Sequence, residues 1–87
     1  NVYYVYFLTS EKDGKPYIGY TDDLKRRLKQ HNDGENISTR HRTPFKLVYY
    51  EAYLSQTDAK TREKQLKRHA QATTSLKRRI KNCLNSV

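Results

Sequence analysis

The sequence has no tryptophan, no methionine, a single cysteine and no long hydrophobic run. A lone cysteine, Cys83, cannot form an internal disulfide framework or a cysteine-based zinc site, and this usage favours a reducing cytoplasm. A membrane-spanning helix needs about 20 consecutive apolar residues. The chain has neither such a run nor a signal-peptide pattern. We therefore expect a cytoplasmic protein without a membrane partner.

The chain is also short, with 87 residues. A chain of this length buries roughly 60% of the surface that it exposes when unfolded, which excludes large α/β barrels, two-domain enzymes and dinucleotide-binding folds with paired halves. Disordered segments are poor in aromatic residues, whereas this sequence has eight tyrosines and two phenylalanines. We expect one small folded domain over residues 1–87.

Acidic residues are scarce: there are nine against 18 lysines and arginines, which gives a formal net charge of +9. The cations form three runs, at residues 25–29, 40–42 and 60–81, and the last run contains one acid, Glu63. A single run of this kind is usually a solvated helix face, but three of them favour a partner rich in phosphates. We expect this partner to be nucleic acid. The residues expected to bind it include Arg26, Arg40 and Lys67.

Two segments near the start of the chain have the composition of strands. Residues 3–9 are aromatic and β-branched, residues 16–20 form a second short run, and Asp13-Gly14 between them is a common hairpin turn. Together they predict an antiparallel hairpin. Because side chains alternate along a strand, Tyr4 and Tyr6 are expected on one face of the sheet, with their neighbours on the other.

A first helix is expected after this hairpin. The Thr21 hydroxyl can cap it, Leu24 and Leu28 lie four residues apart on one face, and the turn formers at 31–34 end it. The following segment, residues 35–44, is polar and typical of a loop.

The rest of the chain predicts one more strand and two more helices. Residues 45–53 have strand character and are long enough to form the central strand, and residues 57–68 form a helix. After a break at 70–74, a last helix begins near Ser75. Its buried face is expected to contain Leu76, Ile80 and Leu84. The order ββαβαα defines an α+β fold with a small, mainly antiparallel, three-stranded sheet flanked by helices.

Five segments of the sequence together resemble a known family. The triplets Tyr4-Val5-Tyr6 and Tyr17-Ile18-Gly19 are separated by ten residues and are followed by segments 21–32, 43–51 and 62–67. In this order they resemble the GIY-YIG endonuclease superfamily, in particular its small stand-alone bacterial members. The chain is also similar to the N-terminal nuclease domain of the excision-repair nuclease subunit. The first triplet departs from the family pattern, with Tyr-Val-Tyr in place of Gly-Ile-Tyr.

The resemblance implies a metal-dependent endonuclease that hydrolyses DNA phosphodiester bonds with one divalent ion, Mg²⁺ or Mn²⁺. Its expected setting is DNA repair or recombination, with DNA and other repair proteins as partners, and with selectivity for DNA structure or for single strands. The resemblance also implies that Glu63 is the metal ligand and that Arg27 and His31 belong to the site. The family's C-terminal asparagine corresponds to Asn82 or Asn85, of which we favour Asn82.

The chemistry of hydrolysis gives these residues roles. Glu63 would hold the ion through oxygen, and the planar guanidinium of Arg27 would donate to a phosphate oxygen. Tyr6 or Tyr17 would take the proton from the attacking water; otherwise His31 takes it and the tyrosines only position groups. Because a free tyrosine has a pKa of about 10, we expect the neighbouring cations to lower that pKa by about a unit or more.

The sequence also predicts the surroundings of two other residues. Gly19, with no side chain, would let DNA approach the backbone, and Cys83 is expected to be a small buried hydrophobe.

The main alternative is a basic nucleic-acid-binding module without catalytic activity. Its strand tyrosines would stack on bases, and Glu63 would only form a helical ion pair with Lys67, four residues later. Cleavage that depends on a metal would distinguish the enzyme from this module.

Overall fold

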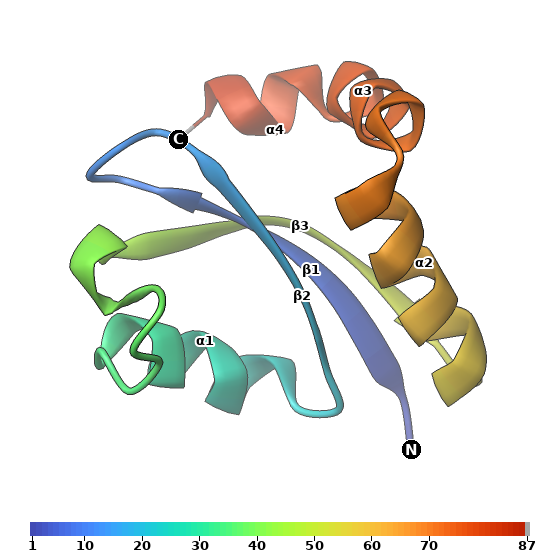
Figure 1. Ribbon diagram of the computed structural model, residues 1–87, viewed down its shortest axis with the longest axis horizontal. Helices are drawn as coiled ribbons and strands as arrows, with labels where there is room; N and C mark the ends of the chain where they lie inside the picture. The colour runs from blue at the N-terminus through green and yellow to red at the C-terminus, as the bar shows by residue number, and fades with distance from the viewer. Residues whose placement is uncertain (87) are drawn as a thin grey trace.

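Three antiparallel strands form the sheet in the computed structural model, which describes residues 1–86 (Figure 1). Strand β1 (Tyr3–Ser10) lies between β2 (Pro16–Thr21) and β3 (Phe45–Tyr53). The prediction that residues 45–53 form the central strand is therefore wrong. The four consecutive buried residues 5–8 are the pattern of a strand covered on both faces, whereas exposed positions recur along β3.

The helices occupy both faces of the sheet, which confirms the predicted α+β class. Helix α1 lies on one face and helices α2 to α4 lie on the other (Figure 1). Their bounds are α1 (Leu24–Asn32), the 3₁₀ turn η1 (Arg40–Arg42), α2 (Gln56–Arg68), α3 (Ala70–Arg79) and α4 (Lys81–Asn85). Among residues 1–86, no helix is long and apolar enough to cross a membrane. Val87, the last residue of the predicted domain, lies outside the described residues.

The first helix is capped by a different residue from the one expected. Thr21 belongs to β2, and the carboxylate of Asp23 accepts the hydrogen bond from the backbone N–H of Arg26. A carboxylate at this position satisfies an unpaired helix N–H and suits the positive end of the helix dipole.

The C-terminal helices also begin and end at unexpected residues. Residues 70–74 are helical, and the chain breaks only at His69, where the backbone is extended, and again at Ile80. Even so, Leu76 and Ile80 are buried and Leu84 packs beside them, as the sequence predicts. One non-helical residue between α3 and α4 leaves these side chains, spaced four residues apart, on the same side of the helices.

The alternation of β1 divides the apolar side chains into two clusters, as predicted. Val5 and Phe7 point to the helices α2 to α4, where they meet Ala59, Leu66, Leu76 and Ile80. Tyr6 and Leu8 point the other way, and the side chains that pack with them include Phe45, Leu24 and Leu28. The functional residues discussed below lie mainly in this second layer, under α1.

A partly buried carboxylate, Glu51 of β3, holds α2 against the sheet. Arg62 of α2 donates to it through two nitrogens, at 3.0 to 3.2 Å, and the hydroxyls of Tyr49 and Tyr53 also donate to it. Burial alone would raise the pKa of Glu51, but these hydrogen bonds outweigh it and lower that pKa. The network fixes α2 at the residue that precedes Glu63.

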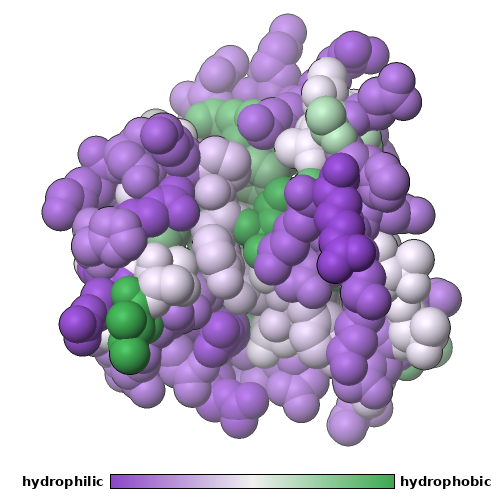
Figure 2. All heavy atoms as spheres, in the orientation of Figure 1, coloured by the Kyte–Doolittle hydropathy of each residue, from purple (hydrophilic) through white to green (hydrophobic). Residues whose placement is uncertain are grey.

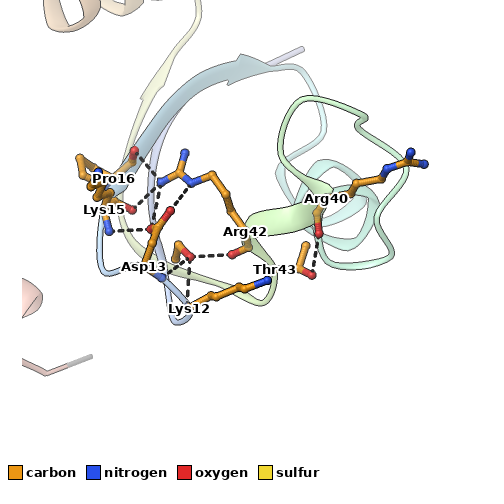
Figure 3. A network of polar contacts seen from close by, with 8 residues as sticks. Lys12, Asp13, Lys15, Pro16, Arg40, Arg42 and Thr43 are labelled. Atoms are coloured by element: carbon orange, nitrogen blue, oxygen red, sulfur yellow. Dashed lines mark hydrogen bonds and ion pairs between the residues drawn. The ribbon is translucent and has the colours of Figure 1, made fainter.

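A second polar network ties the β1–β2 turn to η1 (Figure 3). The Arg42 guanidinium pairs with the Asp13 carboxylate at 2.7 Å and donates to the carbonyls of Lys15 and Pro16. The Ser10 hydroxyl in turn donates to the Arg42 carbonyl at 2.6 Å. This clamp, which we call the Arg42 clamp, fixes one end of the long loop between α1 and β3.

Candidate active site

The Tyr6 hydroxyl lies at the centre of a buried polar cluster on the α1 face of the sheet. It is 3.0 Å from Nε2 of His31, and it accepts a hydrogen bond of 3.4 Å from Nε of Arg27. Gly19 lies opposite Tyr6 in the register of β1 and β2. A Cβ at Gly19 would approach the Tyr6 hydroxyl and ring closer than 3.0 Å, so only glycine leaves room for the phenol here.

The other nitrogen of the imidazole, Nδ1 of His31, is 3.0 Å from Oγ1 of Thr39. His31 is 0% exposed and Thr39 is 2% exposed, so these groups depend on one another for hydrogen bonds. Arg27, Tyr6, His31 and Thr39 therefore form a continuous chain that runs from α1 through β1 to the loop before η1.

Burial sets the protonation of this cluster. Burial raises the pKa of Tyr6 above 10.0, and the hydrogen bond and charge of Arg27 only partly offset it. The expectation that cations lower the tyrosine pKa is therefore wrong for Tyr6, since desolvation is the larger effect. Burial, followed by the charge of Arg27, lowers the pKa of His31 below 6.5. At neutral pH the phenol keeps its proton and the imidazole is uncharged.

Tyr17 of β2 and two residues of α2 border this cluster. The ring centroids of Tyr17 and His31 are 5.0 Å apart. Nζ of Lys67 lies 5.8 Å from the centroid of the Tyr17 ring. Lys67 also pairs with the Glu63 carboxylate at 3.2 Å. The charge of Glu63 contributes to the raised pKa of Tyr6. Although α2 lies on the other face of the sheet, Glu63 and Lys67 thus lie near the predicted phenols at the edge strand β2.

Three other residues do not have the surroundings that the sequence analysis predicts. Asn82 is exposed in α4, which packs through Leu84 on the opposite face of the sheet (Figure 1), so the structure does not bring it to Tyr6. Gly19 is buried, and Tyr6 fills the space beside it, so it does not offer DNA the open backbone that we expected. Cys83 is exposed rather than buried, because it lies off the face that carries Leu84.

The three cations expected to bind nucleic acid are all exposed: Arg26, Arg40 and Lys67. The surface of the molecule is hydrophilic over most of the view in Figure 2. Arg26 is engaged with Asp22 at 3.3 Å, whereas the Arg40 side chain points away from the Arg42 clamp (Figure 3).

Glu63 is the carboxylate that borders this cluster. Within residues 1–86, no three His, Cys, Asp or Glu side chains lie together as a ready metal cage. Glu63 is partly exposed, at 22% for its side chain. Mg²⁺ typically binds one or two carboxylates and completes its shell with water and substrate phosphates. The residues present fit an ion of this kind, held weakly until a phosphate joins it.

Comparisons with known proteins show which family the chain matches. The sequence profile of the GIY-YIG catalytic domain matches residues 2–77, which ends before Asn82. The UPF0213 protein of Streptococcus agalactiae serotype V is 46% identical over 74 residues, or 80% of this chain and 83% of that protein. A UPF0213 protein of Streptococcus pneumoniae serotype 4 is 46% identical over 66 residues, or 75% of this chain. That match spans 66% of the pneumococcal protein, just under two thirds of its length.

A solved structure shares the fold. The solution structure of the UPF0213 protein of Bacillus halodurans is 36% identical and has a TM-score of 0.55, covering 87% of this chain and 81% of that one. The chain belongs to the GIY-YIG catalytic domain family, whose members are endonucleases. The two streptococcal relatives are UPF0213 proteins of this family.

Thr39 is the site residue that the sequence analysis missed. It lies in the polar segment 35–44, where no periodicity or turn pattern distinguishes it from its neighbours. Its contact with His31 spans eight residues and depends on how the loop folds back over α1. Only the tertiary structure reveals it.

The buried, uncharged state of His31 has a consequence for stability. Because its pKa is lower in the folded than in the unfolded chain, the unfolded state binds more protons below pH 6.5, the unperturbed value. We therefore expect the contribution of His31 to the free energy of unfolding to be complete above pH 6.5. This contribution should decrease as the pH falls from 6.5 towards the pKa of His31 in the folded chain. Urea unfolding at several pH values would measure this decrease.

The variant His31→Asn should flatten this dependence, and the matched control His41→Asn, at an exposed histidine, should preserve it. An equal slope in the wild type and in His31→Asn would contradict the assignment.

Proposed function

We propose that this chain is a metal-dependent endonuclease that hydrolyses DNA phosphodiester bonds, with residues 1–87 as its nuclease domain. The observation that carries this proposal is the buried hydrogen-bonded chain of Arg27, Tyr6 and His31 beside Glu63. Stacking on bases needs exposed rings, so Tyr6, which is 2% exposed, could not serve that purpose. The proposal is further supported by membership of the GIY-YIG family.

In the proposed reaction, Tyr6 and His31 act together as the base. The attacking water gives a proton to the Tyr6 oxygen as the phenol passes its own proton to Nε2 of His31, 3.0 Å away. The raised pKa of Tyr6 and the lowered pKa of His31 suit this relay, because no free phenolate is needed and the imidazole is uncharged at neutral pH. General bases of this kind typically accelerate a reaction by about 10²- to 10⁴-fold.

The cations hold the scissile phosphate in this proposal. Nε of Arg27 donates to Tyr6 and Nη1 to Gln30, so Nη2 can donate to a non-bridging phosphate oxygen, for which a guanidinium is well shaped. Within residues 1–86 the Tyr17 hydroxyl has no side-chain or backbone partner, and Lys67 lies over its ring. Tyr17 would orient the water or the phosphate, and Lys67 would contact the DNA backbone.

Glu63 would hold the divalent ion, Mg²⁺ or Mn²⁺. When bound, such an ion supplies Lewis-acid stabilisation of the charge that develops on the phosphate and the leaving oxygen. The carboxylate must first leave its pair with Lys67, an exchange that costs little because such exposed helical pairs contribute only about 0.3 to 0.5 kcal/mol.

We propose DNA repair or recombination in the cytoplasm as the setting, with other repair proteins as partners. Phosphate contacts from exposed Arg26, Arg40 and Lys67 carry no base sequence information. Selection by DNA structure or strandedness, rather than by sequence, follows from such contacts.

A cleavage panel tests the proposed function. Single-stranded, duplex, flap and four-way DNA are incubated with the pure protein and Mn²⁺ or Mg²⁺, with and without chelator. We expect cleavage of at least one substrate that stops when chelator is added. Binding that is sensitive to salt but indifferent to chelator, without cleavage of any substrate, would show the non-catalytic module instead.

A further inference from the structure

A neutral imidazole accepts a proton at Nε2 only in the tautomer that carries its hydrogen on Nδ1, and the partner of Nδ1 decides which tautomer is present. For His31 that partner is the Thr39 hydroxyl, at 3.0 Å. A hydroxyl can donate or accept, so the tautomer must be decided by the remaining contacts of the cluster.

Arg27 influences which of Tyr6 and His31 donates the hydrogen bond between them. A guanidinium can only donate, so the Tyr6 oxygen accepts from Nε of Arg27. The phenol proton is then left for Nε2 of His31. The opposite tautomer would point an N–H at the same oxygen and leave the buried phenol proton without an acceptor among residues 1–86. In the Nδ1–H tautomer, the Thr39 hydroxyl proton is the one that lacks an acceptor among these residues. A phenol is a stronger donor and a weaker acceptor than an aliphatic hydroxyl, so an unmatched Thr39 proton is less unfavourable than an unmatched Tyr6 proton. This difference favours the tautomer in which Nδ1 carries the hydrogen and donates to Thr39.

Backbone hydrogen bonds within the loop hold Thr39 in place. The Thr39 N–H donates to the Asn36 carbonyl at 3.1 Å, and the Arg42 N–H donates to the Thr39 carbonyl at 2.8 Å. Arg42 is itself fixed to the β1–β2 turn by the Arg42 clamp (Figure 3). Thr39 is therefore placed by the hairpin, and His31 by the helix.

We propose that Thr39 is a positioning residue that keeps His31 in the Nδ1–H tautomer and leaves Nε2 ready to take the Tyr6 proton. Its catalytic consequence rests on the proposed function, whereas the tautomer itself does not. The proposal adds to the site a residue that touches neither water nor DNA and acts through the imidazole.

Nitrogen-15 NMR of the imidazole rings tests the tautomer directly. The His31 signal, identified by its loss in His31→Asn, should report hydrogen on Nδ1 in the wild type at pH 7.5. In Thr39→Val, which removes the hydroxyl and keeps the shape, the Nε2–H form should appear. Thr39→Ser should restore the wild-type spectrum. The proposal would be overturned if the wild-type signal showed hydrogen on Nε2, and this result does not depend on whether Thr39→Val folds. It would also be overturned if the spectrum of Thr39→Val were identical to that of the wild type.

Cleavage kinetics form the second arm. We expect kcat to fall about 10- to 100-fold in Thr39→Val, with little change in KM, and to recover in Thr39→Ser. The matched control is Thr43→Val, which loses a hydroxyl in the same loop that only donates to the Arg40 carbonyl. Unchanged kcat in Thr39→Val would overturn the catalytic consequence. A wild type that does not cleave DNA would instead refute the proposed function and leave the NMR result standing.

Discussion

Replacing Glu63 by glutamine is expected to abolish metal-dependent cleavage, with kcat reduced about 1,000-fold or more. Removal of a single group that stabilises the transition-state charge can cost this much, and Glu63 is the only acid between residues 60 and 81. The amide has nearly the same shape, so the measurement compares chemistry and not folding. Initial rates on the best substrate of the cleavage panel, over a range of Mn²⁺ concentrations, would establish the loss.

The fold should be unaffected, because the variant loses only the pair with Lys67, which is 47% exposed and contributes about 0.3 to 0.5 kcal/mol. Binding to DNA should persist, since the substitution removes a negative charge. The matched control, Glu11→Gln in the exposed β1–β2 turn, should cleave normally. Recovery of the wild-type rate by Glu63→Gln at high Mn²⁺ would show that another group holds the ion.

The variant Gly19→Ala is expected to disable the enzyme and to destabilise the fold at once. The new Cβ would approach the hydroxyl and ring of Tyr6 closer than 3.0 Å, and the backbone of the two paired strands cannot easily separate. Overpacking in a core typically costs about 1 to 3 kcal/mol, and we expect the upper part of this range. Displacement of the phenol from His31 should reduce kcat about 100-fold, which a misplacement of about 1 Å can cause.

A double-mutant cycle isolates this clash. Tyr6→Ala removes the ring that the Cβ would strike, so Gly19→Ala should cost much less stability in the Tyr6→Ala background than in the wild type. Urea unfolding of the four proteins measures the difference. Equal costs in the two backgrounds would mean that Gly19 is required for a reason other than room for Tyr6.

The fold followed largely from local patterns. The alternation of residues 3–9, the Asp13-Gly14 turn and the leucine pair of the first helix each express a backbone period of 2 or 3.6 residues, and the structure confirms all three. The central strand was predicted wrongly because strand length does not specify the neighbours of a strand. The order of strands depends on contacts between distant segments, as in the pairing of β1 with β3.

The candidate site was predicted in part. The motifs identified the residues that the structure brings together around Tyr6, but the C-terminal asparagine was assigned from a family pattern in a stretch beyond the matched residues. The pKa of Tyr6 was predicted in the wrong direction. Cations can be counted in a sequence, whereas desolvation depends on what covers the group, and His31, Gly19 and Arg27 enclose this phenol.

The sequence by itself determined the strong positive charge, the hydrophobic periods, the motif order and therefore the family, because these are properties of residue type and spacing. Only the tertiary structure decided which groups are buried, that Thr39 reaches His31, and that Gly19 serves Tyr6 rather than DNA. These facts depend on the approach of segments that are far apart in the chain, and hydrogen-bond direction and desolvation are set by that approach alone.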